Sequence, residues 1–457
     1  MTPIHRLLVA NRGEIAVRII RAAFDEGIET VAVISDADRD SLAAKMADRA
    51  VVIGPAQASA SYLSVEAVVN AAIATGCDAV HPGYGFLSER PELALACDEN
   101  GLTWVGPSVD SLRRGGDKST ARTLAKSLGI PVAEGVEPSS DAEGLLEHVR
   151  AIGYPVLIKA SAGGGGRGMR LVADEAALLS AIEQGGREAQ EAFGDGRVFV
   201  ERFVERGRHV EVQILGDGRG GVIHLGERDC SVQRRYQKIV EEAPAFGLSD
   251  ELRNGLHASA VALGRELNYL GAGTVEFLVD VVRGDYFFLE INTRVQVEHP
   301  VTEMVTGIDI VRQQLRLAQG AELPDQEDIV VRGHAIECRL TSEDPARDFM
   351  PTPGRVTEWV APQGTDVRVD THLFPGYIVP PYYDSLLAKI IVRGANREEA
   401  IATTSRALQR VRVDGISTNL SLLEAVVTDP AFAAMGVTTR WLEADFMPKW
   451  SDGGSHG

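Results

Sequence analysis

The stretch GTVEFLVDVVRGDYFFLEINTR, residues 273–294, decides the expected fold, because it reads as two β-strands joined around residues 281–285. A hairpin centred on Arg283 places Glu276 directly opposite Glu290. Asn292 follows Glu290 by two positions and therefore lies on the same face. The sequence thus predicts two carboxylates and one amide gathered on one face of a strand pair.

The two faces of this hairpin differ in chemistry. The carboxylate face is expected to pair Leu278 with Phe288 and Asp280 with Tyr286, and the other face is an unbroken apolar layer of Val275, Phe277, Val279, Phe287, Leu289 and Ile291. Opposed carboxylates repel unless a cation lies between them. Mg²⁺ fits, because carboxylate and amide oxygens hold it at nucleotide sites and phosphates complete its shell. The alternative is a solvent-exposed charged face, which the flanking Leu278 and Phe288 disfavour.

A glycine-rich loop, SAGGGGRGM, occupies residues 161–169. Such a backbone can turn its N–H groups onto phosphate oxygens and can move as a lid. A flexible linker has a similar composition. The flanks favour phosphate binding, because the loop follows an expected strand ending at Lys159 and precedes the extended run 168–172. The cationic residues that could join it in a phosphate pocket are Lys118, Lys159, Arg167, Lys238, Arg294 and Arg339.

The composition of the 457-residue chain restricts its function. Its net charge of -19 argues against general nucleic-acid binding, which needs a basic face, but leaves room for a local cationic pocket. The four cysteines are scattered without metal-ligand spacing, which predicts a reduced, cytoplasmic protein. We expect no signal peptide and no membrane span.

The order of elements predicts an α/β (α+β) fold of several domains. Residues 7–10, 15–24 and 30–34 read as a βαβ unit, but residues 11–14 lack the GxGxxG of a dinucleotide site. The segment GGDKST around Lys118 likewise fails the Walker pattern. We expect domains at 1–116, at 117–322 with a lid at about 132–203, and at 323–446, the last rich in β-structure, followed by a disordered tail at 447–457.

Longer motifs resemble the biotin carboxylase family of the ATP-grasp superfamily, from about Leu7 to Glu443. These motifs are ANRGEIAVRIIRA (10–22), HPGYGFLSE (81–89), KASAGGGGRGM (159–169), RHVEVQ (208–213), ERDCSVQRR (227–235), EINTRVQVEHPVTEMVTG (290–307), ECR (337–339) and PPYYDSL (380–386). By this resemblance, residues 1–116 form the pre-ATP-grasp domain and 117–322 the ATP-grasp domain.

The resemblance implies roles for individual residues. Those that bind ATP are Lys118, Lys159, Gly163, Gly164, Gly165, Gly166, Gly168, Met169, Glu201, Arg202, Phe203, Val204, His209, Gln233, Tyr236 and Leu278. Those that hold Mg²⁺ or Mn²⁺ are Glu276, Glu290 and Asn292. Those that bind bicarbonate are Lys238, Arg294, Gln296 and the Val297 backbone. Glu298 is the implied general base, and Arg339 faces biotin and phosphate.

The implied reaction has two steps. Bicarbonate, deprotonated by Glu298, attacks the γ-phosphate of ATP to give carboxyphosphate, which yields CO₂ and phosphate. The ureido nitrogen of biotin must lose a proton before it attacks CO₂, and Arg294 stabilises the resulting enolate-like anion. The chain departs from the family at Tyr236, where histidine is usual, and at Arg202 and Phe203, where lysine and tyrosine are common. A neutral phenol there can change nucleotide affinity or its pH dependence.

The implied partners are separate polypeptides. The chain carries no AMKM-type biotin site, since its nearest match at residues 44–46 reads as helix surface. We therefore expect biotin on a biotin carboxyl carrier protein, a carboxyltransferase subunit, and acetyl-CoA or another acyl-CoA as acceptor, toward fatty acid synthesis; pyruvate or urea are alternatives. A homodimer is expected, with Arg21, Asp25 and Arg368 as interface positions. Two other hypotheses are a different ATP-grasp ligase and an inactive nucleotide-binding regulatory subunit.

Overall fold

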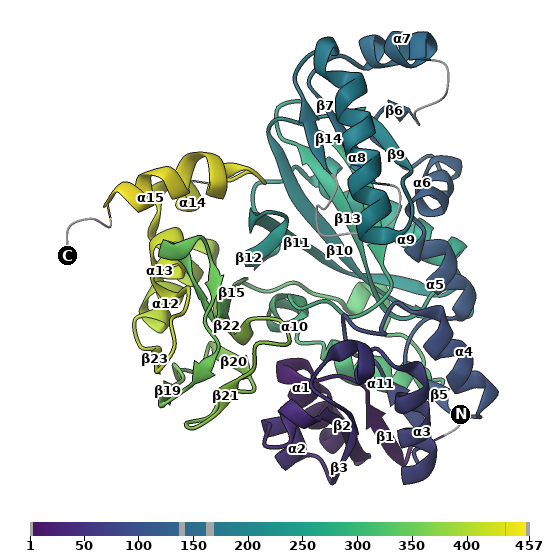
Figure 1. The fold of residues 1–457 in the computed structure, drawn as a ribbon, viewed down its shortest axis with the longest axis vertical. Coiled ribbons are helices and arrows are strands. Elements are labelled where there is room, and N and C mark those ends of the chain that lie inside the picture. Colours follow the sequence, from purple (N-terminus) through teal and green to yellow (C-terminus); the bar gives the residue numbers. More distant parts are fainter. Residues whose placement is uncertain (1–2, 137–141, 161–168, 435, 454–457) are drawn as a thin grey trace.

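The structure is a computed structural model that describes residues 3–136, 142–160, 169–434 and 436–453. The predicted phosphate-loop residues Gly163, Gly164, Gly165, Gly166, Arg167 and Gly168 lie outside the described residues. Its described elements form an N-terminal unit, a long central sheet, a smaller lid and a C-terminal helical layer (Figure 1). None of the described helices is both long and apolar enough to cross a membrane.

The N-terminal unit is a parallel sheet with strand order β3-β2-β1-β4-β5. Its strands are β1 (Arg6–Val9), β2 (Glu29–Ser35), β3 (Arg49–Gly54), β4 (Ala79–His81) and β5 (Thr103–Trp104), and its helices are α1 (Gly13–Asp25), α2 (Leu42–Met46), α3 (Val65–Thr75), α4 (Pro91–Glu99) and α5 (Val109–Gly116). Helix α1 buries Ile15 and Ile19, four residues apart, against this sheet and α11 (Ile310–Ala318). The predicted βαβ unit is confirmed.

The central sheet has eight strands in the order β14-β13-β10-β11-β12-β15-β22-β20. They are β10 (Gly207–Asp217), β11 (Val222–Arg234), β12 (Gln237–Ala243), β13 (Leu270–Asp280), β14 (Asp285–Asn292), β15 (His334–Thr341), β20 (Val367–Thr371) and β22 (Leu386–Gly394). Strand β12 pairs antiparallel with β15. One continuous sheet therefore crosses the domain boundary that the sequence placed at 322/323, and joins the two regions by backbone hydrogen bonds.

The predicted hairpin is present as β13 and β14, and Glu276 does lie opposite Glu290. The rest of the predicted pairing is wrong. A bulge shifts the register, so that Phe277 pairs with Phe288, Leu278 with Phe287 and Asp280 with Asp285. Phe288 therefore joins the buried core in place of Phe287, which is half-buried on the side of Leu278.

The lid has a sheet and a core of its own. Its elements are β6 (Gly135–Val136), α7 (Ala142–Ile152), β7 (Val156–Ala160), β8 (Arg170–Val172), α8 (Leu178–Phe193) and β9 (Val198–Arg202), with strand order β6-β9-β7-β8. Leu145, Val149, Ile158 and Val200 are among its buried core residues. In Figure 1 the lid stands at the opposite end of the molecule from the N-terminal sheet.

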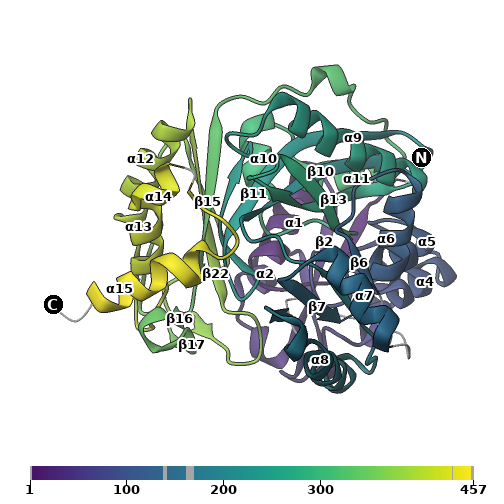
Figure 2. The same ribbon diagram turned by 90° about the horizontal axis from the view of Figure 1, so that it is seen from above.

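Further helices cover the central sheet. They are α6 (Lys118–Ser127), α9 (Asp250–Glu266), α10 (His299–Thr306), α12 (Arg397–Leu408), α13 (Leu420–Thr428), α14 (Pro430–Ala433), a π-helical turn at Leu442–Phe446, and α15 (Met447–Gly453). Figure 2 shows α12 to α15 on one side of β15 and β22, while α10 lies on the other side. Short strand pairs complete the C-terminal region: β16 (Glu343–Asp344) with β17 (Met350–Pro351), β18 (Gly354–Arg355) with β21 (Ile378–Val379), and β19 (Glu358–Val360) with β23 (Arg412–Asp414).

The prediction of a disordered tail at 447–457 is wrong for its first part. Residues Met447–Gly453 form α15, because Met447 and Trp450 pack against the apolar C-terminal core. Residues 454–457 lie outside the described part of the chain.

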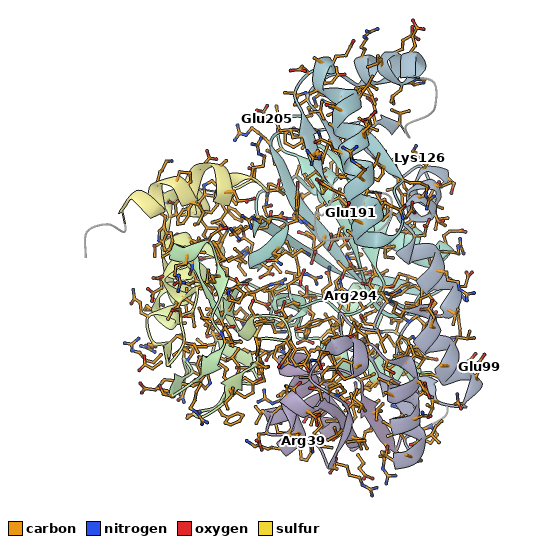
Figure 3. The ribbon with its side chains drawn as sticks, in the orientation of Figure 1. Arg39, Glu99, Lys126, Glu191, Glu205 and Arg294 are labelled. Atoms are coloured by element: carbon orange, nitrogen blue, oxygen red, sulfur yellow. The ribbon has the colours of Figure 1, made fainter. Side chains whose placement is uncertain are left out.

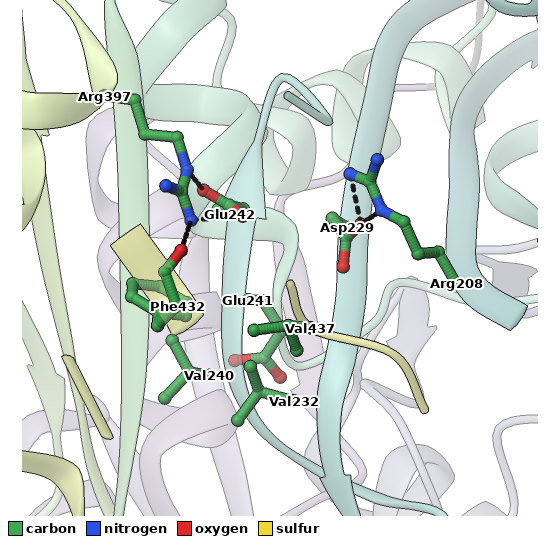
Figure 4. A pocket seen from close by; sticks show the side chains of 9 residues that line it. All are labelled: Arg208, Asp229, Val232, Val240, Glu241, Glu242, Arg397, Phe432 and Val437. Carbon is green, nitrogen blue, oxygen red and sulfur yellow. Dashed lines mark hydrogen bonds and ion pairs between the residues drawn. The ribbon is translucent and has the colours of Figure 1, made fainter. Parts of the chain in front are cut away.

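A small cavity marks the junction between the central sheet and the C-terminal helices (Figure 4). On one side, Arg397 donates to both carboxylate oxygens of Glu242 at 2.6 and 3.1 Å and to the Phe432 carbonyl. On the other, Arg208 pairs with Asp229 at 2.7 Å. These two arginines thus have carboxylate partners within the protein, and we interpret their ion pairs as structural links between the sheet and the C-terminal helices.

Candidate active site

Polar side chains from five neighbouring strands, β14, β13, β10, β11 and β12, share one face of the central sheet. The register sets Glu211 on β10 between Arg228 on β11 and Glu276 on β13. The residues on this face are His209, Glu211, Gln213, Arg228, Lys238, Thr274, Glu276, Glu290 and Asn292. All of them except Glu290, Lys238 and His209 are buried. Figure 3 labels Arg294, which follows Asn292 by two residues, near the middle of the molecule.

The two predicted metal carboxylates are balanced by separate cations. Glu290 Oε2 lies 3.0 Å from Lys118 Nζ at the start of α6. Lys238 Nζ lies 3.1 Å from Glu276 Oε1, and His209 Nε2 lies 3.1 Å from Glu276 Oε2. Burial alone would raise the pKa of Glu276, but these two cations outweigh it and hold the pKa well below its ordinary value.

This donor set fits a divalent metal ion. The oxygens of Glu276 and Glu290 are hard ligands, and the strand register sets the two residues opposite each other. Asn292 uses its amide nitrogen on Glu276 Oε1 at 2.9 Å, while its Oδ1 accepts from Arg294 at 2.9 Å. The carboxylates of Glu211 and Glu276 also converge with His209, so the acidic patch is wider than the sequence predicted.

Lys238 links three carboxylates. Its ammonium lies 2.5 Å from Glu211 Oε2, 3.1 Å from Glu276 Oε1 and 2.5 Å from Glu298 Oε1. Burial disfavours its charge, but these anions raise its pKa well above the ordinary value. Lys238 is therefore a cation between Glu276, a predicted metal ligand, and Glu298, the predicted base.

Glu298 lies at the N-cap position of α10 and is 2% exposed. Lys238 contacts one of its oxygens, and Arg339 donates to the other at 3.0 Å. Burial would raise the pKa of Glu298, but Lys238, Arg339 and Arg228 lower it below its ordinary value. Glu298 is thus a buried, ionised carboxylate held by two cations that are also expected to meet substrate.

Arg228 is the central cation of the site and is fully buried. It donates to Glu211 at 2.6 Å and to Gln296 Oε1 at 2.8 Å, and also to the side chains of Gln213, Thr274 and Thr302. Gln296 in turn donates to Glu276 Oε1 at 2.8 Å. Arg228 therefore fixes the orientation of Gln296 against Glu276, a predicted metal ligand.

The segment 294–298 is held from two other regions of the chain. Arg294 donates to Glu89 Oε2 at 3.0 Å, which ties it to the HPGYGFLSE motif of the N-terminal unit. The Val297 carbonyl accepts from Lys389 Nζ at 2.9 Å. Lys389 is fully buried on β22 and lies 3.1 Å from Glu14 Oε2, which is on α1. The segment is thus tied both to the N-terminal unit and to strand β22 of the central sheet.

The predicted nucleotide residues lie between the lid and the central sheet. Lys159, the last residue but one of β7, forms an ion pair with Glu201 on β9, which Arg122 also reaches at 3.4 Å. The remaining predicted residues here differ in exposure: Gln233 and Val204 are buried, Met169, Arg202, Phe203 and Leu278 are half-buried, and Tyr236 is 50% exposed. Tyr236 occupies the β11–β12 turn with a φ of 64°.

Three models of protein families match the chain. They are "Biotin carboxylase, N-terminal domain" over residues 3–112, "Carbamoyl-phosphate synthase L chain, ATP binding domain" over 117–326, and "Biotin carboxylase C-terminal domain" over 337–444. A curated biotin carboxylase of Pseudomonas aeruginosa is 50% identical over 443 residues, which are 96% of this chain and 98% of that protein. The chain belongs to the biotin carboxylase family. Members of this family are ATP-dependent ligases, and the chain is one of them.

Other relatives agree with this family. Biotin carboxylase 1 of Bacillus subtilis is 47% identical over 448 residues, covering 96% of this chain and 98% of that protein. The Campylobacter jejuni biotin carboxylase, solved as a β-γ-ATP complex, has a TM-score of 0.93 at 44% identity and covers 96% and 98% of the two chains. The biotin carboxylase domain of Hydrogenobacter thermophilus 2-oxoglutarate carboxylase, a dimer solved with MgADP, ADP and bicarbonate, has a TM-score of 0.92 at 43% identity, covering 97% and 98%.

The structure adds residues that the sequence analysis did not single out. They are Glu14, Glu89, Glu211, Arg228, Glu241, Glu337 and Lys389, which bind the predicted residues or lie directly beside them. The sequence could have indicated Glu211, because it follows His209 by two positions on the same strand and must therefore share its face. No comparable signal exists for Lys389 or Glu14, because only the packing of β22 and α1 brings them to Val297.

Proposed function

We propose that Glu298, Lys238, Arg294 and Arg339 carry out the ATP- and bicarbonate-dependent carboxylation of biotin. The observation that supports these roles most directly is the placement of Glu298. Its carboxylate lies between Lys238 and Arg339, and Lys238 also contacts the metal carboxylate Glu276 at 3.1 Å. A base, two cations and a metal-binding face are thus linked by direct contacts.

Glu276 and Glu290, with Asn292, would hold Mg²⁺ or Mn²⁺, which when bound neutralises charge on the phosphate oxygens of ATP. Lys118, Lys159 and His209 supply further positive charge on the same side of the sheet. Each of them is paired with a carboxylate in this structure, to Glu290, Glu201 and Glu276 respectively. A metal ion on Glu276 and Glu290 would free two of these cations for phosphate, which is why metal and nucleotide are expected to bind together.

Bicarbonate would lie against Lys238, Arg294, Gln296 and the backbone at Val297. Its negative charge competes with Glu298 for Lys238, and weakening that ion pair raises the basicity of Glu298. Glu298 then accepts the bicarbonate proton, and the resulting oxygen nucleophile is held close to the γ-phosphate. Arg339, which already donates to Glu298, stabilises the negative charge that is transferred to phosphate.

Biotin would enter beside Arg294 and Arg339. The ureido N–H of biotin would give its proton to the phosphate released from carboxyphosphate. Arg294 is held in place by Glu89 and Asn292 and keeps its charge, so it can stabilise the resulting enolate-like anion without giving up a proton of its own. The pKa of Arg294 is raised despite burial, because Glu89, Glu298 and Glu276 favour its charged form.

The proposal extends to partners and acceptor. Biotin would arrive on a separate biotin carboxyl carrier protein and leave to a carboxyltransferase with acetyl-CoA or another acyl-CoA as acceptor. The curated relatives support this choice, because they are described as biotin carboxylases and match this chain along 98% of their length. In the Rhizobium etli pyruvate carboxylase, by contrast, the matching part is 40% of a longer chain.

We also propose a cytoplasmic homodimer. All four cysteines are free and buried, as expected of a chain in a reducing compartment. Arg21 and Asp25 are exposed on α1. The third predicted interface residue, Arg368, is bound to Glu303 on α10 and to Asp370 on its own strand β20, each at 2.6 Å.

The test is release of ADP by the purified chain with ATP and Mg²⁺, measured with and without bicarbonate and with free biotin or a biotinylated carrier domain. We expect turnover that needs both bicarbonate and biotin. ADP release that needs a different carboxylate and an amine would identify another ATP-grasp ligase. Nucleotide binding without turnover would identify a regulatory subunit, and either result would overturn the proposed roles.

A further inference from the structure

The junction of β12 and β15 brings two buried glutamates face to face. The register pairs Glu241 with Glu337, and both are 0% exposed. Directly opposed residues on antiparallel strands have Cβ atoms roughly 5 Å apart, so their carboxyl groups can meet. Arg339 follows Glu337 by two positions on the same strand face, and β22 sets Lys389 opposite Arg339. Helix α10, which begins after Glu298, covers this face.

The two carboxyl groups have very different partners. Glu241 Oε1 accepts from Arg339 Nε at 2.5 Å, and the second Arg339 nitrogen also contacts it. Glu241 Oε2 and both oxygens of Glu337 are buried without a hydrogen-bond partner among the described residues. The nearby ammonium of Lys389 is directed to Glu14 and to the Val297 carbonyl. Glu337 therefore lacks the direct cation contact that a buried carboxylate needs to stay ionised.

We propose that Glu337 carries a proton at neutral pH, so that Glu241 and Glu337 together hold one negative charge and act as the positioning unit of Arg339. The proton of Glu337 is then available to the free Oε2 of Glu241, its cross-strand neighbour. Burial raises the pKa of Glu337 well above its ordinary value; it also raises that of Glu241, where the contact with Arg339 opposes the effect. The charged groups that face this pair are Arg339 on β15, Lys389 on β22, Lys238 on β12 and Glu298 at the start of α10.

The number of charges in this unit decides how firmly Arg339 is held. When Glu241 and Glu337 together carry one negative charge, Arg339 donates both to Glu241, at 2.5 Å, and to Glu298, at 3.0 Å. A second negative charge, created when Glu337 loses its proton, would draw Arg339 toward the sheet and away from Glu298 and substrate. Activity is therefore expected to fall on the alkaline side as this proton is lost. This step rests on the proposed roles of Arg339 and Glu298, whereas the protonation of Glu337 does not.

The direct test is infrared spectroscopy of the resting protein at neutral pH, in H₂O and D₂O. The wild type is expected to show the C=O band of a protonated carboxylic acid, and Glu337→Gln is expected to lose it. Glu242→Gln is the matched control, because Glu242 is the next residue on β12 and is ion-paired with Arg397 and His334. That variant should keep the band. If Glu337→Gln fails to fold, Glu337→Met is used, since methionine is neutral and similar in length.

The second readout is the pH profile of kcat/KM for bicarbonate. Glu337→Gln should stay within about threefold of the wild type at neutral pH and should lose the part of the alkaline decline that the wild type shows. A wild type without the acid band, or a Glu337→Gln variant that retains it, would overturn the proposal. Loss of more than about tenfold at neutral pH in Glu337→Gln, with activity restored in Glu337→Asp, would show that the residue acts as an anion and would overturn it equally.

Discussion

Lys238 Nζ lies 2.5 Å from Glu298 Oε1, so the cation expected to bind bicarbonate and the expected base form one buried ion pair. In this arrangement the pKa of Glu298 is held below its ordinary value, mainly by Lys238 and then by Arg339, against the opposing effect of burial. A carboxylate of such low pKa is a weak base. It becomes a stronger base when bound bicarbonate competes with it for the ion pair with Lys238. Substrate binding would thus activate the base.

Glu298→Gln should therefore abolish most turnover without preventing ATP binding. Glutamine keeps the size of the side chain but cannot accept the bicarbonate proton, and general bases commonly contribute about 10² to 10⁴ in rate. Biotin- and bicarbonate-dependent ADP release measures the loss, and ATP titration by calorimetry measures binding. Near-normal turnover in this variant would show that another group removes the proton.

Glu290→Gln should raise the Mg²⁺ concentration needed for half-maximal activity by about tenfold or more, since it removes one of two charged metal ligands. It also frees Lys118, which lies 3.0 Å from Glu290 Oε2. Lys118→Met is the control for that second effect, because it leaves both carboxylates in place. Equal Mg²⁺ dependence in the wild type and Glu290→Gln would contradict the metal assignment.

Lys389→Met should weaken bicarbonate binding and destabilise the protein. Removing the ammonium leaves Glu14 buried without its cation, which commonly costs about 3 to 5 kcal/mol, and releases the Val297 carbonyl. The double variant Glu14→Gln with Lys389→Met should recover most of the stability, measured by urea unfolding, but not the KM for bicarbonate. Recovery of both would mean that Lys389 acts only through Glu14.

Glu242→Gln should lower the free energy of unfolding at pH 7 by about 3 kcal/mol, because Arg397 and His334 lose a buried partner. Burial raises the pKa of Glu242, but these partners lower it below its ordinary 4.5. A depressed pKa stabilises the folded state above the ordinary value and loses that effect as pH falls through the folded-state pKa. The difference between variant and wild type should therefore shrink below about pH 4.5 in urea titrations. The exposed Glu398→Gln is the control, and a difference that grows on acidification would contradict this account.

Tyr236→His should make ATP affinity depend on pH near 6.5, because histidine gains a charge there. In the wild type, burial raises the pKa of Tyr236 above its ordinary 10, so the phenol stays neutral. ATP dissociation constants at pH 6 and pH 8 would differ more in the variant than in the wild type. An unchanged ratio would place this side chain outside the range of the phosphates.

The hairpin at 273–294 shows how far local pattern can be used. Period-two alternation correctly predicted that Glu276 and Glu290 lie opposite each other. It failed beyond that pair, because a bulge shifts the register and replaces Phe287 by Phe288 in the core. The position of a bulge depends on how the two strands pack against the surrounding core. It therefore cannot be predicted from the alternation of residues along one strand.

The sequence by itself determined the order of elements, the opposed carboxylates and the set of cationic residues predicted for nucleotide and bicarbonate, since these depend on residue type, spacing and motif. The tertiary structure decided which charges neutralise one another. Pairing of β12 with β15 placed Glu241 opposite Glu337, and packing of β22 against α1 brought Lys389 to Glu14 and Val297. The physical reason is that electrostatic interactions depend on distance and burial, which residues far apart in the chain acquire only when the fold brings them together.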